Sequence, residues 1–144
     1  MSDHLKEIVL QGISTSPGII MGSVAIYKDL EINLSEMSID EADREFHIYE
    51  FRKAIEATMK NLNQNYLSTA NKYGYDYAAI FKGQIALLED KYFLKEVEDE
   101  IRNNLINAEG ATFKVFSSKK EYFMKLDNEY FKDRAFDIQD LKRQ

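Results

Sequence analysis

The residues able to act as nucleophiles or acid–base groups are few and scattered. His4 and His47 are the only histidines of the 144-residue chain, which has no cysteine. Without cysteine the chain can form neither a disulfide nor a thiolate nucleophile, and sulfur cannot hold zinc or an iron–sulfur cluster. His47 lies between Phe46 and Ile48, off the main apolar positions of its segment. We expect both histidines to be surface residues.

Acidic residues are concentrated in two clusters, 39–45 (IDEADRE) and 96–100 (EVEDE). Metal binding or acid–base catalysis needs convergent carboxylates, which this linear spacing does not indicate. We interpret both clusters as solvated helix faces. The segment 16–22 (SPGIIMG) has glycines like a phosphate-binding loop, but it lacks a lysine and a following helix. We interpret it as a turn beside a strand.

The net charge of the chain indicates which class of macromolecule it binds. A net charge of −6 argues against binding to nucleic acid or to an anionic membrane, because both need clustered Lys and Arg. A basic protein is the favoured partner. No apolar run approaches the roughly 18 to 20 residues of a membrane span, and the acidic N-terminus is unlike a secretory signal. We expect a cytoplasmic protein with no membrane insertion and no nucleic-acid partner.

The chain changes character between its first and second parts. Residues 7–29 are rich in Ile, Val and Gly, which predicts one or two short strands around a turn at Pro17 and Gly18. We expect a strand over 19–27, which needs a sheet that the remaining sequence does not obviously supply. Residues 1–34 are therefore assigned to a strand segment and residues 35–144 to a helical domain.

Capping and breaking residues divide the second part into helices. Ser38 and Glu41 fit a capping box that predicts the start of a long helix, and Gly74 predicts its end. Asp76 and Asp90 are expected to cap the second and third helices. An interruption at 107–110 and a bend near 127–128 delimit two further helical segments. The predicted fold is mainly α, an antiparallel helical bundle.

Apolar residues at three- and four-residue intervals predict the buried faces of these helices. The expected stripe of the long helix is Ala42, Phe46, Tyr49, Ile55, Met59, Leu62, Tyr66 and Ala70. That of the third helix is Phe93, Val97, Ile101 and Leu105. Four positions seven apart mark the last two helices: Phe116, Phe123, Tyr130 and Asp137.

The second helix carries Gly83 in its middle, which costs roughly 1 kcal/mol relative to alanine unless packing requires it. The expected core stripe of this helix is Tyr77, Phe81, Ile85 and Leu88. A second strip, about 100° away, consists of Ile80, Gln84 and Leu87, with Gly83 as a bare spot at its edge. Either a partner binds this second strip or another helix of the same bundle covers it.

Three segments carry a family resemblance: GISTSPGIIMGSVAIY (12–27), AIFKGQIALLED (79–90) and DNEYFKDRAFDIQDLKR (127–143). They resemble the amino-terminal region of enzyme I of the bacterial phosphotransferase system, where the usual sequences are close to ASPGIAxGKA, AIFEGHxMLLED and DEYLxERAADIRDIGKR. The segments occur in family order and span nearly the whole chain. The last two motifs are fairly specific to enzyme I, whereas other enzymes that use phosphoenolpyruvate share the first.

The resemblance implies an enzyme that takes phosphate from phosphoenolpyruvate onto a histidine and passes it to HPr, a small phosphocarrier protein. It implies a swivelling α/β domain, incomplete here, to which the N-terminal strand belongs, and an inserted helical subdomain that docks HPr. A carboxy-terminal barrel would bind phosphoenolpyruvate and magnesium and make the parent a homodimer. The family's phosphorylation segment, GGRTSHTA, is absent from these 144 residues. We therefore expect an HPr-docking fragment that needs no cofactor and is inactive alone.

The resemblance also places the HPr-docking residues on the second helix and at two later positions. They are Tyr75, Asp76, Ile80, Gly83, Gln84, Leu87, Phe123 and Arg134. The resemblance thus favours a partner on the second strip, with HPr coming close at Gly83. No residue is assigned a catalytic or metal-binding role.

The sequence departs from the family pattern at several of these positions. Tyr75 and Asp76 stand where the family often has two glutamates, and Lys82 and Lys91 stand near usual acidic positions. Its HPr is therefore expected to be less basic or to bind more weakly. Gln84 and Gln139 replace the usual histidine and arginine. An alternative function is a free-standing helical scaffold or regulatory protein derived from enzyme I.

Overall fold

The computed structural model describes residues 8–13, 17–23, 25 and 37–144. The chain divides into two units, Met1–Glu31 and Ile32–Gln144. In the first unit, the described residues form no helix or strand, and the apolar side chains of Ile8, Ile19 and Ile20 are exposed. Part of the strand predicted over 19–27 lies outside the described residues, as does the predicted domain boundary at 34/35.

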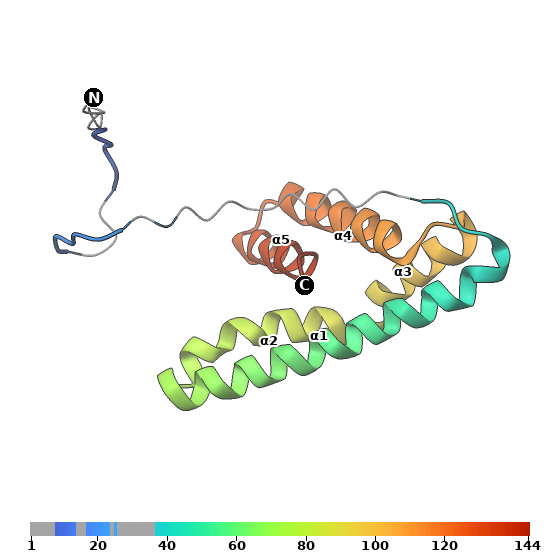
Figure 1. The fold of residues 1–144 in the computed structure, drawn as a ribbon, viewed down its shortest axis with the longest axis horizontal. Coiled ribbons are helices and arrows are strands. Elements are labelled where there is room, and N and C mark those ends of the chain that lie inside the picture. The colour runs from blue at the N-terminus through green and yellow to red at the C-terminus, as the bar shows by residue number, and fades with distance from the viewer. Residues whose placement is uncertain (1–7, 14–16, 24, 26–36) are drawn as a thin grey trace, which may run out of the picture. The chain divides into compact units, whose positions relative to one another are not determined.

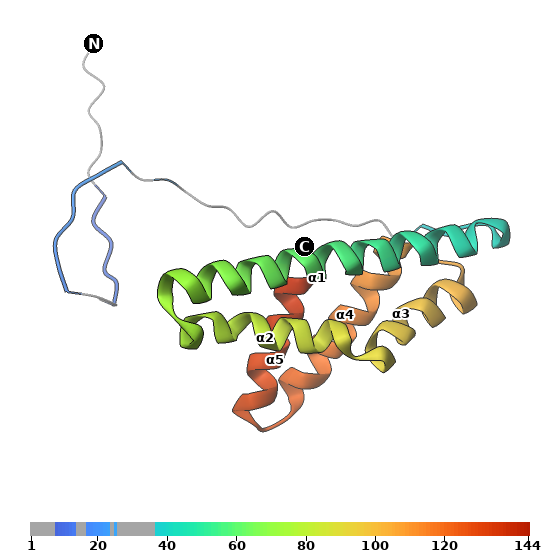
Figure 2. The same ribbon diagram turned by 90° about the horizontal axis from the view of Figure 1, so that it is seen from below.

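The second unit is a bundle of helices, as predicted. A short 3-10 turn, Glu41–Asp43, leads into α1 (Arg44–Tyr73), α2 (Tyr75–Glu89), α3 (Lys91–Asn104), α4 (Ala108–Lys125) and α5 (Glu129–Leu141). Helices α1 and α2 form a long antiparallel hairpin, and α4 and α5 form a second pair on one side of it (Figure 1). The second pair crosses the hairpin at a steep angle (Figure 2).

Two of the predicted helix boundaries are confirmed. Gly74 has a φ of 98°, and its N–H donates to the Ala70 carbonyl at 3.0 Å, which ends α1. The Asp90 carboxylate accepts from the N–H groups of Tyr92 and Phe93 at 2.9 and 3.2 Å, so Asp90 caps α3.

Two other predicted caps are wrong. Ser38 forms an antiparallel bridge with Ile106, because the neighbouring Ile39 N–H donates to the Leu105 carbonyl at 2.8 Å. The helical turn therefore begins only at Glu41. At the second boundary, α2 already begins at Tyr75, so Asp76 lies in its first turn and does not cap it.

The core of the bundle lies where the hairpin meets the second pair of helices. Phe93, Val97 and Ile101 are buried as predicted. The stripe predicted for α1 is wrong at Phe46 and Tyr49, which are exposed, because Ile48 and Phe51 are buried in their place. It is confirmed further along, where Leu62 is buried and Ile55 and Met59 pack against the core. The buried apolar cluster is Ile48, Phe51, Leu62, Leu88, Phe93, Val97, Ile101, Ile106, Ala108, Ala111, Val115, Phe116, Ile138 and Leu141.

The two aspartates near the ends of α2 provide a matched test of capping. We predict that Asp90→Ala lowers the free energy of unfolding by about 1 kcal/mol, because two amide N–H groups lose their acceptor. Asp76→Ala removes the same charge without removing a cap and should cost less than about 0.5 kcal/mol. Urea unfolding followed by helical circular dichroism measures both. Equal losses in the two variants would contradict the assignment.

Candidate protein-docking site

The predicted docking residues of α2 differ in exposure. Tyr75, Asp76 and Ile80 are exposed, and Ile80 is 61% accessible although its side chain is apolar. Leu87 is half-buried and packs against the core, and Gln84 is buried. The structure therefore keeps the strip open at Ile80 but partly closes it at Gln84 and Leu87.

The predicted core stripe of α2 is confirmed at three of its four positions. Leu88 is buried, and Phe81 and Ile85 are half-buried against the core. Tyr77 was expected to join them, but it is exposed. Ala78 takes a buried position near the start of the helix instead.

The close approach at Gly83 comes from the chain itself. A Cβ atom at this position would lie 1.9 Å from Nη1 of Arg134 and 2.8 Å from Oδ2 of Asp137. Both residues belong to α5, which packs across α2 here. The sequence-based expectation of a bare spot for HPr is therefore wrong, because the guanidinium group of Arg134 covers the backbone. A larger residue here would displace the ends of the Arg134 and Asp137 side chains.

Arg134 forms the predicted pair with Asp137, with Nη1 2.9 Å from Oδ2. The guanidinium also lies over the ring of Tyr130, with its central carbon 5.4 Å from the ring centre. The Asp137 residue is only 8% exposed, and this burial raises the pKa of its carboxyl group above the usual 3.8. Arg134 opposes that increase in pKa, whereas the carboxylates of Asp133 and Asp140 add to it.

Phe123 and Leu87 meet in a small hollow beside this crossing. The hollow has a volume of about 100 Å³ and is lined by side chains of α2, α3, α4 and α5, among them Leu87, Tyr92 and Phe123. Phe123 is half-buried and stacks on Phe131, with their ring centres 5.6 Å apart. The structure thus brings two predicted docking residues from different helices into one lining.

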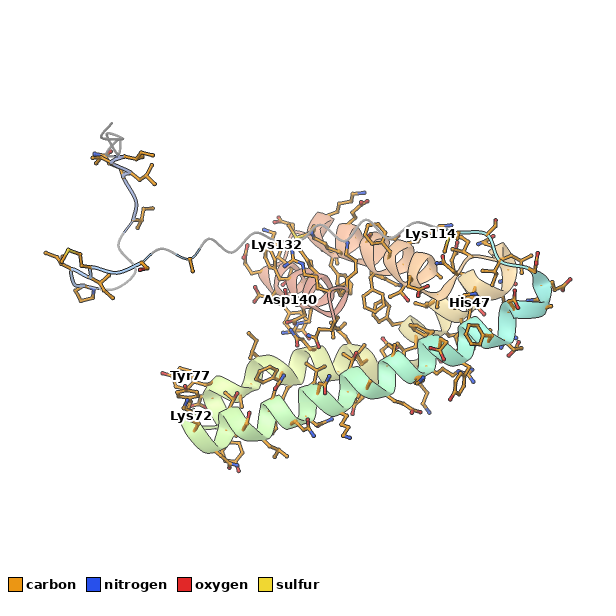
Figure 3. All side chains as sticks on the ribbon, in the orientation of Figure 1. His47, Lys72, Tyr77, Lys114, Lys132 and Asp140 are labelled. Carbon is orange, nitrogen blue, oxygen red and sulfur yellow. The ribbon has the colours of Figure 1, made fainter. Side chains whose placement is uncertain are left out.

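Sequence reasoning missed a group of tyrosines at the turn between α1 and α2. The rings of Tyr73 and Tyr77 lie 6.5 Å apart, and both residues are exposed. Figure 3 shows Tyr77 and Lys72 at this end of the hairpin. Tyr77 and Ile80 are three residues apart on α2, so helical spacing places them on one face. Tyr73 is the last residue of α1, so its place beside Tyr77 depends on the turn at Gly74 and did not follow from that spacing.

His47 lies far from this face, near the start of α4 (Figure 3). It was expected at the surface, but it is half-buried, and its Nδ1 accepts from the N–H of Ala108 at 3.5 Å. His4 lies outside the described residues. Among the residues that the structure describes, no group of three or more His, Asp or Glu is placed to bind a metal ion.

The acidic clusters take part in contacts between helices. Arg52 of α1 donates two hydrogen bonds to the Glu98 carboxylate, at 2.7 and 2.8 Å. Lys119 of α4 pairs with Glu96 at 2.5 Å. The 96–100 cluster is therefore more than a solvated face, since it joins α3 to its neighbours. No helix in the described part of the chain is long and apolar enough to cross a membrane.

Comparison with known proteins identifies relatives along nearly the whole chain. The family model described as "PEP-utilising enzyme, N-terminal" matches residues 11–134. The phosphoenolpyruvate-protein phosphotransferases of Haemophilus influenzae and Buchnera aphidicola subspecies Schizaphis graminum are 31% and 32% identical over 133 residues. Each alignment covers 92% of this chain and 23% of the relative, so the chain spans about a quarter of the length of these relatives.

A solved structure supports the same relationship. A solution structure of enzyme I (nEIt) matches this fold with a TM-score of 0.73 and 28% sequence identity, over 78% of this chain and 46% of that chain. The family model covers the whole of α2, which carries Ile80 and Gly83, and it ends at Arg134 of α5. The chain belongs to the family of PEP-utilising enzymes and corresponds to the N-terminal region of that family.

Proposed function

We propose that this chain is the HPr-docking part of a phosphoenolpyruvate-protein phosphotransferase. The single observation that carries the proposal is the outward position of Ile80, which is 61% exposed on α2, three residues before the Gly83 backbone that the guanidinium group of Arg134 covers. An exposed apolar side chain next to directed hydrogen-bond donors is a common pattern at protein interfaces. The relatives named above supply the biological context.

The docking face, as we define it, consists of Tyr75, Asp76, Ile80, Leu87, Phe123 and Arg134 at its surface, with Gly83 and Gln84 beneath. Burying Ile80 contributes about 1.5 to 3 kcal/mol, whereas micromolar binding needs about 8 kcal/mol. Other contacts must supply the difference. The exposed rings of Tyr73 and Tyr77 extend the face along the same side of the hairpin.

The charge of the docking face determines how basic the contact surface of its HPr should be. Asp76 is the acidic residue within it, and the exposed Lys82 and Lys91 lie on or next to the same helix. Such a face attracts a strongly basic partner less than a face with several glutamates would. We therefore propose a partner HPr whose contact surface is less basic, held mainly by apolar contacts.

The longer enzyme would perform the remaining steps elsewhere in its sequence. In this proposal it is a cytoplasmic homodimer that binds phosphoenolpyruvate and magnesium in a carboxy-terminal barrel. The described residues do not fit a magnesium site, since no three of their His, Asp or Glu side chains converge. In this proposal, the task of this chain is the recognition of HPr.

We predict that Ile80→Asp weakens HPr binding at least about tenfold, because a charge replaces an apolar side chain that HPr would bury. Leu87→Asp is a poorer probe, since Leu87 packs against the core and the variant would also lose stability. Isothermal titration of HPr into the variant measures the affinity. Helical circular dichroism should match that of the unchanged chain.

Tyr49→Asp is the control for this prediction. Tyr49 is 61% exposed, as Ile80 is, but it lies near the start of α1 and is not part of the docking face. Its variant should bind HPr with unchanged affinity. If the unchanged chain does not bind HPr at all, the chain is a scaffold or regulatory protein and the proposal is wrong.

A further inference from the structure

Few contacts fix the position of the Arg134 guanidinium group. Its side chain is 27% exposed, so most of it is enclosed between α2 and α5. The buried Nε atom of Arg134 and the buried Oδ2 atom of Asp137 have no hydrogen-bond partner in the described part of the chain, so the two side chains are joined as an ion pair. Tyr130 provides only a ring face, with the guanidinium carbon 5.4 Å from its centre. Asp137 provides the one carboxylate that pairs with Arg134 among the described residues.

Asp137 is shielded from solvent by the packing of α5 against α2. It lies one helical turn after Arg134 on α5, and its side chain is only 11% exposed. Its Oδ2 would lie 2.8 Å from a Cβ atom at Gly83, so it faces the same bare backbone as the guanidinium. A buried carboxylate paired with an arginine fixes that arginine more tightly than an exposed pair does.

We infer that Asp137 is a positioning residue for HPr docking, which acts by holding the Arg134 guanidinium across Gly83 beside Ile80. The inference rests on the proposed function of the docking face. Asp137 does not itself meet HPr, because it is buried beneath Arg134. Its effect on binding therefore passes through Arg134 alone. Removing its charge frees the guanidinium to leave the face, so HPr binds a less ordered surface.

The test is a double-mutant cycle on HPr affinity, measured by titration calorimetry with the 144-residue chain. Asp137→Asn should weaken HPr binding about tenfold, and Arg134→Ala should weaken it at least as much. In the Arg134→Ala background, Asp137→Asn should have no further effect on affinity, because the residue through which it acts is gone. A merely structural role for Asp137 would lower affinity equally in both backgrounds.

A control and a second readout complete the experiment. Asp140→Asn makes the same charge change one turn further along α5, at the exposed residue shown in Figure 3, and should leave HPr affinity unchanged. The Nε–Hε signal of Arg134 in an NMR spectrum should be distinct in the unchanged chain and move to the position of mobile arginines in Asp137→Asn. If the unchanged chain binds HPr and Asp137→Asn binds it equally well, the inference is wrong. If the unchanged chain does not bind HPr, the proposed function fails first.

Discussion

Phe116→Ala should lower the free energy of unfolding by about 3 to 5 kcal/mol, the largest stability loss that we expect from one substitution here. Phe116 is 2% exposed, and its ring centre lies 4.6 Å from that of Phe93 on α3. Truncation removes this ring contact and leaves a cavity between α3 and α4. Domains of this size are stabilised by about 5 to 15 kcal/mol in total, so the loss is a large share.

Phe113→Ala is the matched control, because it removes the same side chain from the same helix. Phe113 is 38% exposed, and the ammonium group of Lys142 lies 4.1 Å from its ring centre. Such a contact contributes about 0.5 to 1 kcal/mol, and the ring is only partly buried, so this variant should lose much less stability than Phe116→Ala. Urea unfolding of both variants decides the question. Equal losses would show that the ring of Phe116 is not a core element.

Gly83→Ala should destabilise the chain by about 2 kcal/mol and weaken HPr binding more than tenfold. Alanine is the better helix former, so propensity alone predicts a gain of about 1 kcal/mol. The added Cβ would lie 1.9 Å from Arg134 Nη1, which forces the guanidinium away from Asp137. A carboxylate that is 8% exposed then loses its only charged partner in the described part of the chain.

Ala79→Gly measures the propensity contribution on the same helix. Ala79 is exposed, so its substitution should cost about 1 kcal/mol from helix propensity and leave HPr affinity unchanged. We therefore expect both Gly83→Ala and Ala79→Gly to lower the free energy of unfolding, although one substitution adds a methyl group and the other removes one. A gain in stability for Gly83→Ala, with HPr affinity retained, would mean that Arg134 does not need the bare backbone.

Local signals in the sequence predicted the helical bundle and some of its helix boundaries. Gly74 and Asp90 end and begin helices through contacts with residues two to four positions away, so their roles follow from the sequence alone. The capping box at Ser38 failed for the opposite reason. Its segment pairs with residues 105–107, almost seventy positions later, and this distant pairing overrides the local preference.

The stripe on α1 shows a second limit of sequence reasoning. Two overlapping apolar sets compete near its start, Phe46 with Tyr49 and Ile48 with Phe51, and helical spacing fits both. The structure buries the second set because the later helices pack on that side. Periodicity gives the width of an apolar face, but the neighbours decide which of two adjacent faces is buried.

The candidate site was partly predictable for related reasons. Family resemblance and helical geometry together selected Ile80, which the structure leaves exposed. The reason for Gly83 could not be found from the sequence, because it depends on where Arg134 of α5 crosses α2. The alternative in which another helix covers the second strip is therefore correct at Gly83 and Gln84, whereas Ile80 remains available to a partner.

The most direct test of the docking face is an NMR search for magnetisation transfer between isotope-labelled chain and unlabelled HPr. We predict intermolecular nuclear Overhauser effects from HPr to the methyl groups of Ile80, and none to those of Ile48, which is buried on α1. Such contacts at Ile80 would place HPr on the face beside Arg134. HPr binding with no contact at Ile80, or with contacts confined to another face of the bundle, would contradict the account.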